Sequence, residues 1–185
     1  MKNVFYMHKI SKIGGVESFL YYLSKLYDDF VVYYKEADPI QIERLAKNVE
    51  VHRYTKPIKC KRFFCSYKYD IEVEAEEYYH IIHYDAMNVG FTPMTNDNFK
   101  YIGVSKVACD SFYKKTGKKC ELIYNVVPIK KINVEKLPGL NLISATRLTS
   151  EKGGERINKL AEILDKNNID YKLTIYTNKT RYPFK

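Results

Sequence analysis

The chain has 185 residues and a formal net charge of +9 at pH 7. This length accommodates one doubly wound domain with a buried core and the opening of a second domain, but not two full domains. Apolar residues make up 45% of the chain and charges of both signs are spread along it, so the composition excludes an intrinsically disordered protein. The positive charge favours an anionic partner, which leaves nucleotide phosphates, nucleic acid and an acidic membrane face open.

The apolar run Val4–Met7 is the sole candidate for a targeting segment, and His8 and Lys9 end it. It is much shorter than a signal-peptide core or a membrane span, so we expect a cytoplasmic protein. The cysteines have neither a CxxC pairing nor histidines at zinc spacing, which argues against a metal or disulfide framework. They are Cys60, Cys65, Cys109 and Cys120.

The first third of the chain alternates between strand-like and helix-like segments. Apolar and β-branched runs predict strands over 3–7, 30–34 and 49–54, and apolar residues at helical spacing predict helices over 16–26 and 40–46. Because β-α-β alternation implies a parallel sheet, the expected class is α/β, with a Rossmann-like doubly wound sheet.

The middle of the chain is less regular. The pattern breaks down into basic and aromatic residues over 56–69, and the acidic stretch 72–77 is expected to be helical. Strands are predicted over 80–84, 101–104 and 122–124. Between the last two, Ser105 is expected to cap a helix that Gly117 ends.

Two prolines and a lysine pair, with no sustained period, indicate an exposed linker before Gly139. We therefore expect an N-terminal domain over 1–130, a linker over 131–139 and the start of a second domain over 140–185. That second part is predicted to be a single β-α-β unit, with strands over 140–145 and 171–176 around a helix over 155–166, which is too little to enclose a core of its own.

Gly14 and Gly15 lie between the first strand and the first helix, where an open parallel sheet leaves a crevice at the carboxyl ends of its strands. Glycine lets backbone approach a ligand closely, and the helix N-terminus offers unpaired N–H groups to a phosphate or hydroxyl. The alternative is a glycine turn that serves only to reverse the chain.

Arg147 and Lys152 bracket the loop between the strand ending at Ala145 and the helix that begins near Gly153. Two cations and a helix dipole together favour a diphosphate. The alternative is that both side chains are solvated and have no ligand.

His83 closes a predicted strand at the same carboxyl edge and is followed by Asp85. A histidine there could accept a hydroxyl proton or hydrogen-bond a sugar, or it could be purely structural. His80 and His83 should point to opposite faces of the strand, which argues against a shared metal ion.

Four segments resemble glycosyltransferase family 4, also called the group 1 glycosyltransferases, and their order agrees with it over nearly the whole chain. They are Ile13-Gly14-Gly15-Val16-Glu17, Ile102-Gly103-Val104-Ser105-Lys106, Ile123-Tyr124-Asn125-Val126-Val127 and the run from Leu142 to Gly153. They are similar to the family's GGxE turn, its V-S-K segment, its I-Y-N-G-V entry to the linker and its R-L-x-x-E-K-G loop. Asn125-Val126 departs from the family's Asn-Gly, and residues 56–78 contain no family landmark.

The resemblance implies a GT-B fold and transfer of a sugar, with retention, from a nucleotide-diphosphate sugar to a saccharide or lipid-linked acceptor, without a metal or other cofactor. It places Arg147 and Lys152 on the donor diphosphate, with Gly14 and Gly15 approaching it from the other domain. His83 would be the catalytic residue, and Asp85 and Glu17 would lie on the acceptor side. Such bacterial enzymes typically serve the synthesis of cell-surface polysaccharides or glycolipids. The resemblance therefore also implies peripheral contact with the anionic inner face of the membrane.

The resemblance also implies an acidic E-x7-E segment that this sequence does not reach, so we expect the 185-residue chain alone to lack transferase activity. Two other functions stay open. One is a different nucleotide-binding Rossmann enzyme, although the first strand is not followed by GxGxxG. The other is a non-catalytic basic module for membrane or nucleic acid, based on the stretch 56–64, although no nucleic-acid-binding motif is present.

Overall fold

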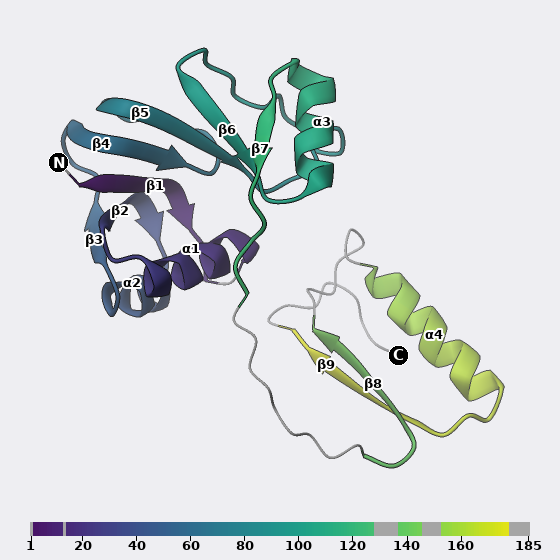
Figure 1. Cartoon of the computed structure of the whole chain (residues 1–185). Coiled ribbons are helices and arrows are strands. Elements are labelled where there is room, and N and C mark those ends of the chain that lie inside the picture. The colour runs from purple at the N-terminus through teal and green to yellow at the C-terminus, as the bar shows by residue number, and fades with distance from the viewer. Residues whose placement is uncertain (1, 13, 128–136, 146–152, 178–185) are drawn as a thin grey trace. The chain divides into compact units, whose positions relative to one another are not determined.

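The computed structural model describes residues 2–12, 14–127, 137–145 and 153–177. The chain divides into two compact units, residues 1–129 and 130–185 (Figure 1). The first unit is built on a sheet of seven strands, and the second on a sheet of two.

All six neighbouring strand pairs of the larger sheet are parallel, and the strand order is β3-β2-β1-β4-β5-β6-β7. Consecutive strands progress outward in one direction from β1 and in the other direction from β4, as in a doubly wound sheet. The strands are β1 (Asn3–Ile10), β2 (Phe30–Ala37), β3 (Glu50–Arg53), β4 (Ile58–Cys65), β5 (Val73–Ile82), β6 (Phe99–Gly103) and β7 (Cys120–Leu122).

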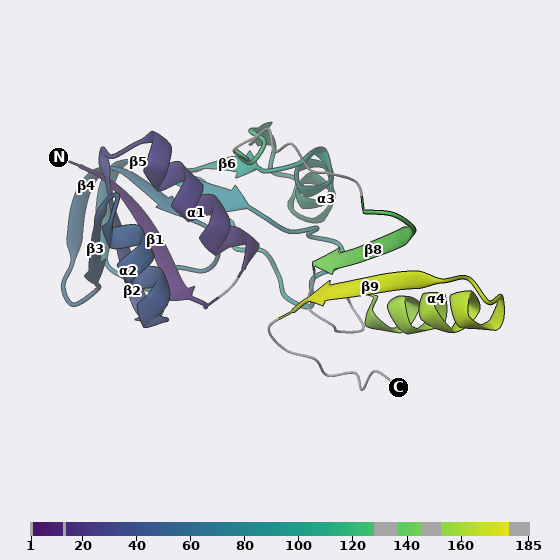
Figure 2. The ribbon, with the colours of Figure 1, turned by 90° about the horizontal axis from the view of Figure 1, so that it is seen from below.

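Helices cover both faces of this sheet, so its strands are buried on two sides as a parallel sheet requires. On one face lie α1 (Gly15–Leu26) and α2 (Pro39–Ala46) (Figure 2). They pack Leu20 and Leu45 against the β1 and β2 residues Phe5 and Val32. On the other face, α3 (Lys106–Thr116) packs Phe112 into a second core with Phe63 and Tyr101.

The predicted ends of α3 are confirmed. The Ser105 side chain accepts a hydrogen bond from the Ala108 amide, which satisfies one free N–H of the first turn. Gly117 follows the helix in the left-handed conformation, with φ 72°, and donates its N–H to the Tyr113 carbonyl. A side chain at Gly117 would be strained by this backbone conformation.

Two predictions for the middle of the chain are wrong. The stretch 56–69, for which no element was expected, contains β4 in the middle of the sheet, and the acidic stretch 72–77 is the beginning of β5 rather than a helix. In β4 the buried positions are Ile58 and Cys60, then Phe63 and Cys65. The alternation of period two changes phase in the middle of the strand, which obscures the pattern.

The basic and acidic stretches belong together because they are neighbouring strands. Lys59 of β4 pairs with Glu74 of β5 at 2.8 Å, and Arg62 pairs with Glu77 at 2.7 Å. Lys100 of β6 reaches the other oxygen of Glu77 at 2.6 Å, and these two hydrogen bonds lower the pKa of Glu77 to about 2. Part of the charge of the basic stretch is thus neutralised within the sheet, which fixes strand register more than it adds stability.

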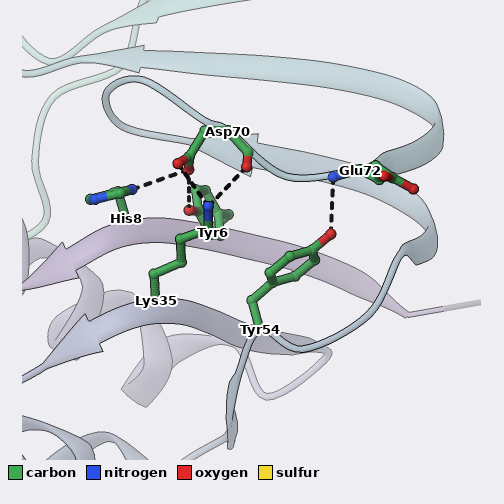
Figure 3. Close-up of polar contacts among 6 residues, drawn as sticks. All are labelled: Tyr6, His8, Lys35, Tyr54, Asp70 and Glu72. Carbon is green, nitrogen blue, oxygen red and sulfur yellow. Dashed lines mark hydrogen bonds and ion pairs between the residues drawn. The ribbon is translucent and has the colours of Figure 1, made fainter.

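The connection from β4 to β5, residues 66–72, is an extended segment with no helix. Ile71 and Tyr69 contribute to the same core as Phe63, so the segment lies on the face that α3 also covers. Its polar anchor is Asp70 (Figure 3). The Asp70 carboxylate accepts hydrogen bonds from the hydroxyl of Tyr6 at 2.9 Å and the ammonium of Lys35 at 2.7 Å, and it contacts His8.

This arrangement ties the segment to β1 and β2 at once, and the amide of Glu72 donates to the hydroxyl of Tyr54, just beyond β3. The Lys35 ammonium, followed by His8 and Tyr6, holds the pKa of Asp70 well below its ordinary value. A depressed folded-state pKa contributes stability above pH 4, which is lost as the pH falls further.

The second unit contains β8 (Leu140–Ala145), α4 (Gly154–Lys166) and β9 (Tyr171–Tyr176), and β8 pairs with β9 in parallel. Both strands and the helix lie where the sequence predicts them. Gly153 precedes α4 in the left-handed conformation, with φ 76°, so a residue without a side chain is favoured at this point of the loop.

We predict that Asp70→Asn lowers the free energy of unfolding at pH 7 by about 1 kcal/mol, because it replaces charge-assisted hydrogen bonds that are partly solvated. The difference from the wild type should shrink below pH 4, where Asp70 of the unfolded wild-type chain takes up a proton that the folded state does not bind. Urea unfolding at several pH values measures both. The control is Asp97→Asn, because Asp97 pairs with Lys118 while 90% exposed. Equal effects of the two substitutions would contradict the anchoring role of Asp70.

Candidate functional site at the carboxyl edge of the sheet

The reversal of strand order lies between β1 and β4. In doubly wound sheets, ligands bind outside the carboxyl ends of the strands at this point. Because the strands are parallel, the loops that follow β1, β4 and β5 all begin at that edge. They carry the glycine turn at Gly14, the pair Ser66 and Tyr67, and the run His83-Tyr84-Asp85.

The glycine turn is shaped by Glu17, from the first turn of α1. The side chain of Glu17 is buried and accepts a hydrogen bond from the amide of Ser11 at 2.8 Å. A Cβ on Gly14 would lie 2.0 Å from Oε2 of Glu17, so a larger residue here would displace the carboxylate that accepts from Ser11. Gly15 begins α1, and a Cβ there would meet nothing within 4 Å. Gly14 therefore has a structural reason to be glycine, whereas packing gives none for Gly15.

His83 is held between two neighbouring elements. Its Nε2 lies 3.3 Å from Oγ of Ser66, the first residue after β4, and its ring packs edge-on against Phe19 of α1 at a centroid distance of 5.0 Å. Burial, with a smaller contribution from His80, lowers the pKa of His83 to about 4. The ring is consequently neutral at pH 7 and offers a nitrogen acceptor to a hydroxyl group.

His80 lies on the opposite face of β5. Its ring packs beside Phe99 and Tyr101, and neither ring nitrogen reaches hydrogen-bonding geometry with a described residue. Burial lowers the pKa of His80 to about 4, which the backbone of Met94 and Ser66 offsets only in part. Within the described ranges, no three His, Cys, Asp or Glu side chains gather closely enough to hold a metal ion.

Asp85 has both carboxylate oxygens engaged. One accepts from the amide of Met87 at 3.0 Å and the other from the side chain of Asn88 at 2.6 Å, which forms a tight turn directly after His83 and Tyr84. Aromatic residues precede and follow this turn in the chain. The ring of Tyr84 stacks parallel to that of Tyr67 at a centroid distance of 6.1 Å and meets the ring of Phe91 edge-on at 5.1 Å.

The structure brings together the sequence-predicted residues of the first unit, namely Gly14, Gly15, Glu17, His83 and Asp85, at one edge of one sheet. Arg147 and Lys152 lie outside the described residues. Sequence reasoning missed Ser66, Tyr67, Tyr84 and Phe91. The first two were missed because β4 was not recognised, and the alternation of Ile58, Lys59, Cys60 and Lys61 was the signal that could have revealed it.

No protein-family model and no curated protein sequence matches the chain. A solved structure does match it. It is the crystal structure of Anabaena HepE in complex with UDP, with a TM-score of 0.57 and 14% sequence identity, over 95% of this chain and 69% of that one. The likeness shows the fold. The chain has an α/β, Rossmann-like architecture with a doubly wound parallel sheet, followed by a second β-α-β unit.

We predict that the stability of the protein falls as the pH is lowered from 6.5 towards 4. Folding keeps His80 and His83 neutral while the unfolded chain takes up a proton on each, so each histidine favours the unfolded state over this range by roughly 3 kcal/mol. His80→Phe should remove the contribution of His80 and leave that of His83, since the phenyl ring suits the aromatic neighbours and leaves no unpaired nitrogen. Thermal unfolding from pH 4 to pH 7 measures this, and an unchanged profile in the variant would contradict it.

Proposed function

We propose that this chain is part of a glycosyltransferase of the GT-B type that transfers a sugar, with retention, from a nucleotide-diphosphate sugar to a saccharide or lipid-linked acceptor. The observation that carries the proposal is the likeness in fold to HepE, whose crystal structure holds UDP, combined with the residues gathered at the carboxyl edge. It is supported by the resemblance of four segments to glycosyltransferase family 4.

In this proposal the donor diphosphate is held by Arg147 and Lys152 at the N-terminal side of α4. A guanidinium and an ammonium beside a helix N-terminus offer charge-assisted hydrogen bonds to phosphate oxygens. Gly14 and Gly15 contribute backbone. A side chain at Gly15 would meet no other residue, so we propose that glycine is used there because a ligand approaches its backbone closely.

The neutral ring of His83 is proposed to accept a hydrogen bond from the acceptor hydroxyl. With a pKa of about 4 it binds a proton weakly, so its contribution is positioning of the hydroxyl as much as proton transfer. Ser66 fixes the ring through its hydroxyl, and Phe19 fixes it by packing. Glu17 and Asp85 serve the acceptor side by shaping the two loops, since their carboxylates are engaged there.

A place in cell-surface polysaccharide or glycolipid synthesis, in the cytoplasm or at the inner face of the membrane, belongs to the same proposal. None of the helices within the described ranges combines the length and the apolar character needed to cross a bilayer. Contact with an anionic membrane would rely on basic side chains other than Lys59 and Arg62, which are paired with Glu74 and Glu77. We propose no metal and no nucleic-acid partner.

We predict that Arg147→Ala and Lys152→Ala each weaken UDP or GDP binding by about tenfold to a hundredfold, because each removes charge-assisted hydrogen bonds. Gly15→Ala should also weaken it, roughly threefold to tenfold, without lowering thermal stability, since the new methyl group meets only a ligand. Isothermal titration calorimetry measures the affinities, with Lys166→Ala at the far end of α4 as the control.

Equal nucleotide affinity in all of these variants would contradict the donor site. Binding of arbitrary DNA with steep salt dependence and no response to UDP or GDP would favour a basic binding module instead.

We predict that His83→Ala slows turnover of the active transferase by 10² to 10⁴ if the ring transfers a proton, and by less if it only positions the acceptor, with nucleotide affinity nearly unchanged in both cases. Ser66→Ala should give a smaller loss of the same kind, because it removes only the orientation of the ring. Released nucleotide measures turnover, and circular dichroism checks folding. A fully active His83→Ala, or a variant that merely unfolds, would return His83 to a structural role.

A further inference from the structure

Three aromatic side chains gather at the carboxyl edge beside His83. Tyr67 is the second residue after β4 and Tyr84 the second after β5, and their rings are stacked 6.1 Å apart with an interplanar angle of 9°. Phe91, from the loop that follows, meets Tyr84 edge-on at 5.1 Å. Tyr84 packs against the buried core, whereas Tyr67 is 44% exposed and Phe91 is 47% exposed.

Packing alone does not account for this group. Tyr27 and Tyr113 are at least as exposed, yet within the described part of the chain neither has an aromatic neighbour. The three rings at the edge instead contact one another in a row, with the half-buried Tyr84 in the middle. A rigid aromatic patch that stays open to solvent and is rimmed by polar groups is typical of a binding surface.

The polar rim identifies the kind of ligand. Each of the two tyrosines follows a polar residue of the site: Ser66 precedes the exposed Tyr67, and His83 precedes the half-buried Tyr84. The carboxylate of Asp85 and the amide of Asn88 lie in the turn that follows. Exposed aromatic rings with hydroxyl, imidazole and carboxylate groups nearby match a pyranose ring, which has C–H bonds on a face and hydroxyl groups around its rim.

The charged groups beside the rings are of both signs, which does not favour a lipid headgroup or a phosphate at this place. Burial and then the nearby carboxylate of Glu17 raise the pKa of Tyr67, whereas the ammonium of Lys115 donates to the carbonyl oxygen of Phe91 at 3.3 Å. Asp85 adds a second carboxylate along the same edge. Such a mixed surrounding gives an anionic ligand no concentration of positive charge, whereas the hydroxyl groups of a neutral sugar can donate hydrogen bonds to the carboxylates.

We propose that Tyr67, Tyr84 and Phe91 form an aromatic shelf on which a pyranose ring of a neutral saccharide acceptor packs, with its reacting hydroxyl directed at His83. This inference rests on the proposed glycosyltransferase function and selects the acceptor class that it left open. Tyr67 and Phe91 are positioning residues for the acceptor, and Tyr84 orients them.

A tryptophan reporter tests the shelf, because the chain contains no Trp and Phe91→Trp introduces a single one. The probes are methyl α- and β-pyranosides of glucose, galactose and mannose, neutral disaccharides such as maltose and lactose, and vesicles containing anionic phosphatidylglycerol. We expect at least one neutral sugar to change the tryptophan fluorescence saturably at millimolar concentration, and the vesicles to have no such effect.

Variants in the Phe91→Trp chain separate stacking from general packing. Tyr67→Leu keeps apolar bulk but removes the ring, and it should weaken sugar binding about threefold to tenfold, whereas Tyr67→Phe should leave it nearly unchanged. The matched control is Tyr27→Leu, an exposed tyrosine that precedes β2 at the other edge of the sheet. Circular dichroism confirms folding of each variant, and Phe91→Leu observed by saturation-transfer NMR of the sugar provides a second test.

No fluorescence response to any neutral sugar, an equal loss in Tyr27→Leu, or a response to vesicles alone would overturn the shelf. UDP titration of the same proteins keeps the two proposals apart. UDP binding without shelf-dependent sugar binding would refute only the acceptor assignment, and shelf-dependent sugar binding without any UDP or GDP binding would refute the transferase function while leaving a carbohydrate-binding surface.

Discussion

Every strand pair in the larger sheet is parallel, and this constraint determines where the functional groups lie and which surfaces must be covered. Parallel strands place all of their carboxyl ends at one edge, so the turn at Gly14, the hydroxyl of Ser66 and the ring of His83 come together although they lie as much as 69 positions apart in the chain. A parallel sheet is also buried on both faces, so the segments that connect its strands must cover those faces.

Between β4 and β5 the sheet is covered by the seven-residue segment 66–72 instead of a helix. The hydrogen bonds of Asp70 hold this segment in place, as packing would hold a helix. Ile71 and Tyr69 supply apolar contact, while Asp70 joins Tyr6 of β1 to Lys35 of β2. The segment begins with Ser66 and Tyr67, which are part of the candidate site. A connection that is short and held at its far end leaves these two residues little freedom, which is a favourable basis for orienting His83.

The sequence predicted the elements whose local signals agree with their tertiary role. The helix α3 has a capping serine, Ser105, and a terminating glycine, Gly117. In the second unit, α4 and β9 have regularly spaced apolar residues. It failed at β4, where the alternation changes phase near Cys60, and at the first half of β5, where Glu74 and Glu77 are placed by lysine and arginine on adjacent strands. Such cross-strand pairing is invisible to any local window. The candidate site followed the same division: His83 ends a recognisable strand, whereas Ser66 and Tyr67 follow a strand that was missed.

The distribution of charge gives a physical reason for dividing the proposed ligands between the two units. The net charge of +9 suggests an anionic partner for the protein as a whole, but at the carboxyl edge of the first unit the charged site residues are Glu17 and Asp85, and the nearby histidine is neutral. Phosphate oxygens are better matched by Arg147 and Lys152, which belong to the second unit. On this argument we propose that a neutral, hydroxyl-rich ligand binds to the first unit by stacking and hydrogen bonds, and that phosphate groups bind to the second unit.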